Sequence, residues 1–315
     1  MHSRAALILF PGALGDMVCL EPAVAWLAAQ GRTSTIAARG AAREVAAFFP
    51  ARPQTVSLDA PWVARLFAPL AADGPPDVPA PLQAAGLVLS FTGRGHPAAE
   101  ARFAAAGASC HSFPARAGTT GHAADLFLAA VSGGQVSAPA VPRLTPAAGI
   151  AAEPGLLVVH PGSGGAAKRA PLSIWLGLIE DWRRSVRGSV EVLLGPAEAG
   201  EDHPWHAAGA EVIRPEDTSE LVGRIARASI FAGNDAGPSH VAAALGVRSI
   251  VFYTVTHPAT FGPRGFVAAV SGAHEDPERA LAVASGLALT AHEGDLNGAT
   301  WLAAVSRQRG DSSPG

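Results

Sequence analysis

Residues 156–186 read LLVVHPGSGGAAKRAPLSIWLGLIEDWRRSV, and this stretch decides the fold. It opens with an apolar run typical of a buried strand, continues through a glycine-rich loop and ends in a sequence typical of a helix. A strand followed directly by a helix is the repeating part of βαβ units, in which the strands lie parallel and helices cover the sheet. The stretch therefore predicts an α/β fold.

The same alternation runs through the rest of the chain. In the first half it predicts strands at 5–10, 33–38, 54–58 and 86–91, and helices at 18–30, 41–49, 62–70, 98–106 and 123–132. In the second half it predicts further strands within 190–196, 229–235 and 248–254, and helices at 220–228 and 238–246. We therefore predict two Rossmann-like, doubly wound parallel-sheet domains that face each other across a cleft, since such sheets bind ligands at their carboxyl ends.

The domain boundaries follow from composition. Residues 137–155 are rich in Pro and Ala and show no periodicity, which is typical of a linker. We predict a first domain at 1–140, a linker at 141–154, a second domain at 155–306 and a flexible tail at 307–315.

The composition and net charge of the chain exclude several classes of protein. Hydrophobic residues make up 49% of the 315 residues and charged residues 16%, so large cores can form and global disorder is excluded. The net charge is −3 with no basic run, which argues against a nucleic-acid partner. Two cysteines are too few for a disulfide framework, and neither a signal peptide nor an apolar run of ~18 residues is visible. We expect a cytoplasmic protein that can still make peripheral contact with the inner membrane; the oligomeric state is unknown.

Lys168 is the single lysine among 23 basic residues, and it lies in the glycine-rich loop. Ser163, Gly164 and their neighbours can cradle a phosphate with backbone N–H groups, although the spacing is not that of a Walker A loop. A compact ammonium can follow a diphosphate as its charge grows, whereas a guanidinium fits a fixed fork. The alternative is a solvated surface lysine. Arg169 is a second phosphate contact or a solvated side chain.

Residues 10–18, FPGALGDMV, predict a strand that turns tightly into a helix. Gly12 and Gly15 permit backbone conformations or close approaches that a Cβ would forbid. Asp16 falls at the helix start, where it is either an N-cap or, at the rim of the predicted interdomain cleft, a general base.

Two further segments of the second half carry polar groups beside predicted strands. Glu198 follows a strand end, where a carboxylate can accept both hydroxyls of a ribose; the alternative is an exposed loop acid. In GNDAGPSH (233–240) a strand ends and a helix begins, so that its positive end suits a phosphate. We assign Asp235, Ala236, Gly237 and His240 to this turn, Asp235 as a cap or a substrate contact and His240 as a phosphate donor or a half-buried helix residue.

The sequence contains no D-x-D pair, no metal-ligand cluster and no G-x-S-x-G motif. We therefore expect no metal and no cofactor other than the substrate itself. In such an enzyme, cations and helix N-termini stabilise the charge on a leaving group, and Lys168 with the 236–240 turn supplies both.

Four segments in this order resemble glycosyltransferase family 9, the ADP-heptose:lipopolysaccharide heptosyltransferases. They are ALGDMVCLEPAVAWL (13–27), HPGSGGAAKRAPLSIW (160–175), LLGPAEAGED (193–202) and GNDAGPSHVAAALGVRSIVFYTVTHPATFGP (233–263). The resemblance implies a GT-B fold, with the acceptor on the first domain (1–140, the acceptor-side domain) and the nucleotide sugar on the second (155–306, the nucleotide-sugar-binding domain). It also implies a metal-independent inverting glycosyltransferase that moves a heptose-like sugar from a nucleotide diphosphate to a lipopolysaccharide-core, glycan or glycolipid acceptor, with ADP-heptose as the expected donor.

The resemblance also implies roles for single residues. Asp16 is similar to the catalytic base, Lys168 to the residue that stabilises the departing diphosphate, and Glu198 to the ribose ligand. Asp235 corresponds to the residue that contacts the sugar or organises the loop, and Gly237 with His240 lines the phosphate end. The chain departs from the family at Ala236, which lacks a hydroxyl that Ser239 could replace, and at Phe10, where relatives carry a basic residue. These departures leave open a catalytically silent nucleotide-sugar or glycan-binding protein, and a GT-B-type sugar-nucleotide epimerase is a further alternative.

Overall fold

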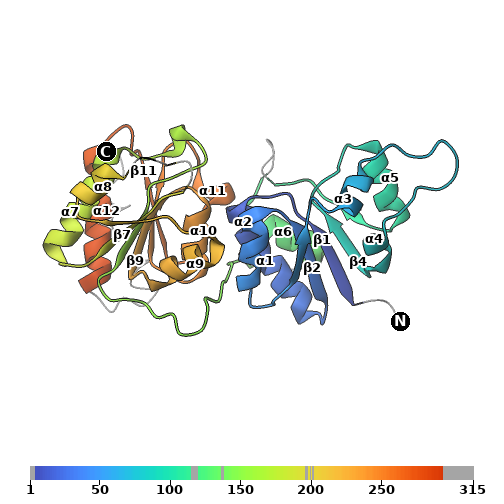
Figure 1. The fold of residues 1–315 in the computed structure, drawn as a ribbon, viewed down its shortest axis with the longest axis horizontal. Helices are drawn as coiled ribbons and strands as arrows, with labels where there is room; N and C mark the ends of the chain where they lie inside the picture. The colour runs from blue at the N-terminus through green and yellow to red at the C-terminus, as the bar shows by residue number, and fades with distance from the viewer. Residues whose placement is uncertain are drawn as a thin grey trace. The chain divides into compact units, whose positions relative to one another are not determined.

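The structure is a computed structural model that describes residues 4–114, 120–135, 138–195, 198, 200 and 202–293. The chain divides into two compact units, Met1–Arg143 and Leu144–Gly315. Each unit is an α/β layer structure built on its own parallel sheet, visible as two separate sets of arrows (Figure 1). The predicted tail at 307–315 lies outside the described residues.

The first unit carries a five-stranded sheet. The strands are β1 (Ala5–Leu9), β2 (Thr33–Ala38), β3 (Gln54–Ser57), β4 (Leu87–Ser90) and β5 (Ser109–Cys110), in the order β3-β2-β1-β4-β5. All neighbouring pairs are parallel. The sheet order therefore reverses between β1 and β4, which is the point at which doubly wound folds bind ligands.

Helices cover both faces of this sheet. They are α1 (Leu14–Ala29), α2 (Gly40–Val45) with the 3₁₀ turn η1 (Ala46–Phe48), α3 (Pro61–Leu66), α4 (Ala80–Ala84), α5 (Pro97–Ala105) and α6 (Ala123–Ser132). Helices α1 and α6 pack against each other. On the other face, Leu7, Leu9 and Val88 from the strands form a buried core with Leu66 and Phe103 from the helices.

The second unit carries a six-stranded parallel sheet. Its strands are β6 (Leu157–His160), β7 (Val190–Leu193), β8 (Glu211–Ile213), β9 (Ile230–Asn234), β10 (Ser249–Tyr253) and β11 (Val267–Ser271), in the order β11-β10-β9-β6-β7-β8. All neighbouring pairs are parallel. Here the strand order reverses between β6 and β9.

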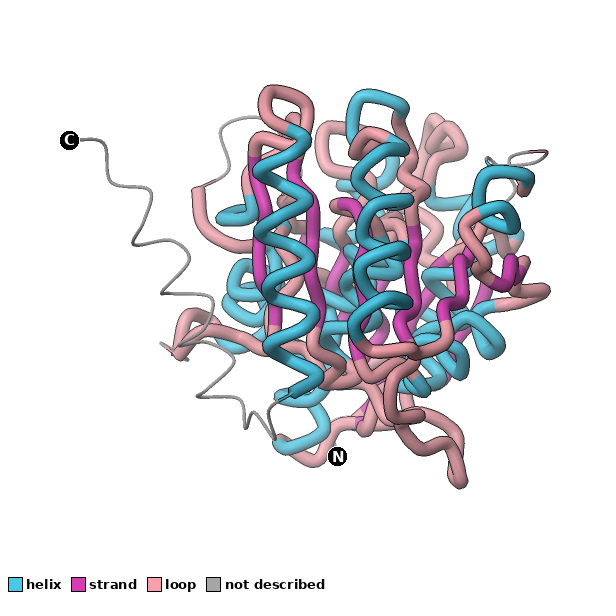
Figure 2. The backbone as a smooth tube through the Cα atoms, turned by 90° about the vertical axis from the view of Figure 1, so that its left-hand side faces the viewer, coloured by secondary structure: helices cyan, strands magenta, loops and turns pink. Residues whose placement is uncertain are grey.

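The helical elements of the second unit run beside its strands (Figure 2). They are η2 (Ala166–Lys168), α7 (Leu172–Ser185), α8 (His203–Ala207), α9 (Thr218–Arg227), α10 (Gly237–Ala244), α11 (Pro258–Phe261) and α12 (Pro277–Glu293). Helices α7 and α12 pack against each other and share one core with the sheet, in which Trp175 and Trp182 are fully buried. Trp175 also donates its Nε1–H to the carbonyl of Ala170 (3.2 Å), so the first turn of α7 anchors the end of the glycine-rich loop.

The predicted linker spans the boundary between the two units. Arg143 donates its backbone N–H to Glu21 Oε2 in the first unit (2.9 Å), and the next residue, Leu144, donates to the carbonyl of Ala244 in the second (2.9 Å). Glu153 bonds to the carbonyl of Arg227. Within the described residues, no helix has the length and apolar character needed to cross a membrane.

Candidate functional site

The polar groups predicted in the second unit gather at the carboxyl edge of its sheet. The loops that follow β6, β7, β9 and β10 all leave from this edge, because the strands are parallel. The glycine-rich loop follows β6 and the GNDAGPSH turn follows β9, and these two strands are hydrogen-bonded neighbours. The two segments therefore meet at the point where the strand order reverses, as ligand sites of this fold class do.

Lys168 and Asp235 form an ion pair across this point. Lys168 Nζ lies 3.1 Å from Asp235 Oδ2, and the lysine side chain is 38% exposed, whereas that of Asp235 is 10% exposed. The same carboxylate oxygen accepts the hydroxyl of Thr256 (2.7 Å). Lys168 is therefore held at the edge of the sheet by a nearly buried partner.

Asn234 fixes both ends of the glycine-rich loop. Its Oδ1 accepts the N–H of Ala170 (3.0 Å), and its Nδ2 donates to the carbonyl of Pro161 (2.6 Å). The residue is fully buried at the end of β9. One amide thus satisfies two backbone groups that would otherwise be buried without partners, so it sets the shape of the loop that carries Lys168.

Glu198 is buried and accepts hydrogen bonds from the two loops around it. Its Oε1 accepts a hydrogen bond from Arg169 Nη2 (2.7 Å), and its Oε2 accepts the N–H of Gly195 (2.9 Å). A Cβ on Gly162 would lie 2.9 Å from this carboxylate, so a larger residue there would displace Glu198. The alternatives of an exposed loop acid at Glu198 and of a solvated Arg169 are therefore wrong.

Two polar side chains at the edge remain without partners among the described residues. The Ser163 hydroxyl is buried and unpaired, and so is Nδ1 of His160, the last residue of β6. Burial lowers the pKa of His160 to about 4, against a backbone hydrogen bond that raises it and with a smaller lowering by the charge of Arg169, so the ring is neutral at pH 7. Unsatisfied buried groups of this kind call for an explanation, and a ligand in the loop supplies one.

The helix after β9 presents its amino terminus to the same edge. Ala236 is the N-cap of α10, and Gly237 begins the helix. His240 lies in the first turn and is buried, 6% exposed, rather than half-buried as the structural alternative for this residue predicted. Ser239 cannot replace the hydroxyl missing at Ala236, because its own hydroxyl is fully buried and donates to the carbonyl of Asn234 (2.6 Å).

Sequence reasoning missed the contribution of the segment after β10. Thr254 donates its hydroxyl to the carbonyl of Ala167 in η2 (2.6 Å), and Thr256 donates to Asp235. These two hydroxyls hold the backbone and the carboxylate partner of Lys168, respectively. The signal that could have revealed them is two threonines directly after a buried strand that ends at the same edge.

In the first unit, the turn between β1 and α1 forms as the sequence predicts. A Cβ on Gly12 would lie 2.5 Å from the ring of Phe10 and 2.7 Å from Cβ of Asp16, so only glycine fits. Gly15 lies in the first turn of α1. Asp16 is partly exposed, and its Oδ2 accepts the N–H of Ala13 (2.8 Å). Ala13 is the N-cap, so Asp16 caps from the third helical position and the prediction of an N-cap position is corrected.

Phe10 belongs to a buried aromatic cluster. Its ring lies 5.9 Å from Phe91, 5.6 Å from Phe113 and 5.3 Å from Phe127, measured between centroids, and the residue is fully buried. The position where relatives carry a basic residue is thus part of the core in this chain.

The described residues contain no group of three or more His, Cys, Asp or Glu side chains arranged to hold a metal ion. Of the predicted site residues, Gly12, Gly15 and Asp16 lie on one turn of the first unit. The remainder lie on the carboxyl edge of the second.

The model of glycosyltransferase family 9 (heptosyltransferase) matches residues 131–300, more than half of the chain. No curated protein matches the sequence significantly. Among solved structures, the chain is similar to a family 9 glycosyltransferase from Veillonella parvula (14% identity, TM-score 0.69, covering 95% of this chain and 97% of that one). It is also similar to ADP-heptose LPS heptosyltransferase II of E. coli (15%, 0.66, 97% and 99%) and to E. coli heptosyltransferase WaaC with ADP (16%, 0.60, 85% and 94%). These likenesses, together with the two parallel sheets, confirm the predicted GT-B fold.

Proposed function

The chain belongs to glycosyltransferase family 9 and is a glycosyltransferase, and on this premise we propose that it transfers a heptose-like sugar from ADP-heptose to a glycan or glycolipid acceptor, in the first place the core of lipopolysaccharide. Inversion at the anomeric carbon and independence from metal ions are part of the proposal. The observation that carries it is the Lys168–Asp235 ion pair at the strand-order reversal, beside the amino terminus of α10.

The geometry of this pair supports a diphosphate as ligand. An ammonium has three N–H donors, and Lys168 uses one of them on Asp235. Two donors are left for phosphate oxygens. The first turn of α10 adds backbone N–H groups and about half a positive charge. The unpaired hydroxyl of Ser163 on the facing loop completes the set of donors.

The reaction needs one proton transfer and one displacement. Asp16 takes the proton of the acceptor hydroxyl, and the resulting oxygen nucleophile attacks the anomeric carbon of the donor sugar. The bond from that carbon to the diphosphate oxygen breaks, and the leaving nucleoside diphosphate takes the bonding electrons. Lys168 and the α10 amino terminus stabilise the charge that forms on this leaving group.

ADP as the nucleotide is supported by the names of similar solved structures, an ADP-heptose LPS heptosyltransferase II and a heptosyltransferase WaaC with ADP. The predicted cytoplasmic location and peripheral contact with the inner membrane stay predictions. Ala236 favours one competing function, a protein that binds nucleotide sugars without transferring them, because the turn lacks a hydroxyl there and Ser239 is committed elsewhere.

Calorimetric titration with ADP, UDP and GDP tests the donor side. We expect ADP to bind most tightly, and Lys168→Ala to weaken ADP binding about 10- to 150-fold, because a hydrogen bond to a charged group contributes about 1.5–3 kcal/mol. Lys168→Arg keeps the charge but not the compact geometry and is expected to restore only part of the affinity.

Arg184→Ala is the matched control, since it removes one positive charge from an exposed side chain of α7 in the same unit. Equal ADP affinity in the Lys168→Ala and Arg184→Ala proteins would contradict the assignment of Lys168. Tight ADP binding without formation of any glycoside product, followed by mass spectrometry across a panel of acceptors, would favour the silent binding protein.

A further inference from the structure

Tyr253 is a polar residue at the carboxyl edge of the second sheet that the donor site described above does not include. It is the last residue of β10 and the only tyrosine in the chain. Strands β9 and β10 are parallel, hydrogen-bonded neighbours. The end of β10 therefore lies directly beside the turn that carries Asp235.

The register of the two strands places Tyr253 next to Asp235. Phe252 pairs with Asn234 in the ladder of β10 and β9. The N–H of Asp235 donates to the carbonyl of Phe252 (3.1 Å), so the ladder continues by one residue. Neighbouring strands lie about 4.8 Å apart, and the backbones of Tyr253 and Asp235 are therefore adjacent.

The side chain of Tyr253 lies on the face of the sheet that α10 covers. Side chains alternate between the faces along a strand, and Phe252 belongs to the core that the sheet shares with α7 and α12. Val251, two residues before Tyr253, pairs with Gly233 and shares its face. A Cβ on Gly233 would lie 2.8 Å from the Ser239 hydroxyl in the first turn of α10. Tyr253 thus lies on the same face as the amino-terminal turn of α10.

The hydroxyl of Tyr253 is a hydrogen-bond donor without a partner in the part of the chain that the structure describes. The residue is 3% exposed. Burial, followed in effect by the charge of Asp235, raises the pKa of the Tyr253 hydroxyl, so the group keeps its proton at neutral pH. Buried polar groups are normally hydrogen-bonded, and this hydroxyl therefore calls for an acceptor.

An anion at the amino terminus of α10 is the acceptor that fits this donor. The free N–H groups and the positive dipole end of a helix favour negative charge there. The N-cap, Ala236, has no hydroxyl, and the hydroxyl of Ser239 is already bonded to the carbonyl of Asn234. Tyr253 therefore adds a side-chain hydroxyl at a helix end that otherwise offers a ligand its backbone N–H groups.

We propose that Tyr253 is a further donor-binding residue, whose hydroxyl donates a hydrogen bond to a phosphate oxygen of the nucleoside diphosphate at the amino terminus of α10. The proposal rests on the proposed function, because it concerns the same diphosphate. Lys168 and Ser163 contact this group from the loop after β6, and Tyr253 contacts it from β10. Since β6 and β10 flank β9, the diphosphate is held from both sides of the central strand.

The single tyrosine makes a direct test possible, because its NMR signal needs no assignment. The full chain is produced with ¹³C at the tyrosine Cζ, the carbon that carries the hydroxyl, and is titrated with ADP or with adenosine. We expect the signal to move as ADP saturates the site and to move less with adenosine, which has no phosphate. A signal that stays in place at saturating ADP, or that moves equally with adenosine, would overturn the proposal.

Tyr253→Phe removes the hydroxyl and keeps the ring. We expect ADP binding, measured by calorimetry, to weaken at least about tenfold, as for the loss of a hydrogen bond to a charged group. The free energy of unfolding in urea without ADP should not fall, because the hydroxyl has no partner in the unliganded chain. A purely structural hydroxyl gives the opposite pair of results, lower stability with unchanged ADP affinity, and that outcome would refute the assignment.

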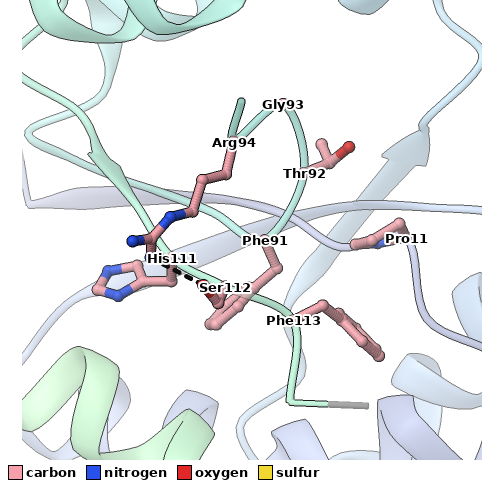
Figure 3. Close-up of a pocket in the computed structure, with 8 residues that line it drawn as sticks. All are labelled: Pro11, Phe91, Thr92, Gly93, Arg94, His111, Ser112 and Phe113. Atoms are coloured by element: carbon pink, nitrogen blue, oxygen red, sulfur yellow. Dashed lines mark hydrogen bonds between the residues drawn. The ribbon is translucent and has the colours of Figure 1, made fainter. Parts of the chain in front are cut away.

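Ala236→Ser in the Tyr253→Phe protein returns a hydroxyl to the same helix end. It should recover most of the lost ADP affinity, and no recovery would contradict the placement of the phosphate at α10. Ser112→Ala is the control from the first unit, where the Ser112 hydroxyl accepts a hydrogen bond from Arg94 Nη1 (2.8 Å) beside a pocket (Figure 3). Its loss should leave ADP affinity unchanged, and a loss of affinity equal to that in Tyr253→Phe would count against Tyr253.

The proposed function and the role of Tyr253 can fail separately. If UDP or GDP binds in place of ADP and moves the Tyr253 signal, the assignment of the base fails and the role of Tyr253 stands. If ADP binds while neither the signal nor the affinity of Tyr253→Phe responds, the role of Tyr253 alone is refuted. Absence of binding by all three nucleoside diphosphates would refute both.

Discussion

Replacement of Asp16 by asparagine separates the two roles that this carboxylate can play. In the structure it accepts the N–H of Ala13 at 2.8 Å, so part of its value is structural. An asparagine side chain keeps an oxygen acceptor for that hydrogen bond but cannot take a proton from an acceptor hydroxyl. Loss of the charge near the amino terminus of α1 costs about 0.3–1 kcal/mol of stability.

The expected effect on transfer is much larger. A positioned general base contributes about 10²–10⁴ in rate, which corresponds to about 2.7–5.4 kcal/mol of activation free energy. We therefore expect Asp16→Asn to lower kcat by at least about 100-fold while the free energy of unfolding, measured with urea, falls by no more than about 1 kcal/mol. ADP affinity should stay within a few fold of that of the unsubstituted protein.

Asp125 offers a matched control. It occupies the third position of α6 in the same unit, as Asp16 does in α1, and its Oδ1 accepts a backbone N–H from Ala140 (2.7 Å). Asp125→Asn thus imposes the same loss of charge on another carboxylate that accepts a backbone N–H near a helix start, and its kcat should be unchanged. If Asp16→Asn retains more than about a tenth of the activity, Asp16 is a helix cap and the base lies elsewhere.

Two further predictions concern groups that hold the site and the boundary between the units. Thr256→Val removes the hydroxyl that orients Asp235. We expect KM for the nucleotide sugar to rise about fivefold, because a lost hydrogen bond costs about 1 kcal/mol, while kcat changes little. Thr256→Ser should restore KM, and an unchanged KM in Thr256→Val would exclude a positioning role for this hydroxyl. Burial raises the pKa of Glu21 from 4.5 to about 7, although the hydrogen bond from Arg143 acts in the opposite direction. The folded protein therefore binds the proton of Glu21 more tightly than the unfolded chain does. As the pH rises from 4.5 to 7, the free energy of unfolding is expected to fall by about 3 kcal/mol. Urea unfolding at pH 5 and pH 8 should show this fall disappear in Glu21→Gln but persist in the exposed control Glu275→Gln, and an identical pH dependence in both variants would contradict it.

Local patterns predicted the elements whose apolar runs are long. The stretch at 156–186 gave β6, the loop and α7 in that order, and the four strands predicted in the first half are β1 to β4. Shorter or weakly patterned elements were not predicted from the sequence. The strands β5, β8 and β11 were not predicted, because two- to five-residue strands that contain Ala, Ser or Glu do not stand out from loops. The helix α12 was not predicted either.

Partners within the site could not be predicted from neighbours in sequence. Asn234 bonds to Ala170 and Pro161, which are 64 and 73 positions away. Such pairs depend on which strands lie side by side, and strand order is a property of the whole sheet. The sequence does place the chemistry-bearing residues at strand ends, and the parallel arrangement then brings those ends to one edge. It does not reveal which of them bond to each other.

The contrast between Lys168 and Arg169 shows why the chain keeps its single lysine where it does. Arg169 directs its fork at Glu198, which is buried and held from its other side by Gly195, so this pair is fixed on both sides and fastens the loop to its neighbour. Among the described residues, the Lys168 ammonium has one hydrogen-bond partner, a carboxylate that Thr256 also binds, and more than a third of the lysine side chain is exposed. A flexible stem with two unused donors can shift from Asp235 towards a diphosphate while Arg169 and Asn234 keep the loop in place. A guanidinium at position 168 would find a carboxylate already shared with a hydroxyl, and its rigid fork would follow a departing phosphate less well. Arg169 therefore fixes the loop, and the adjacent Lys168 supplies a charge that can move.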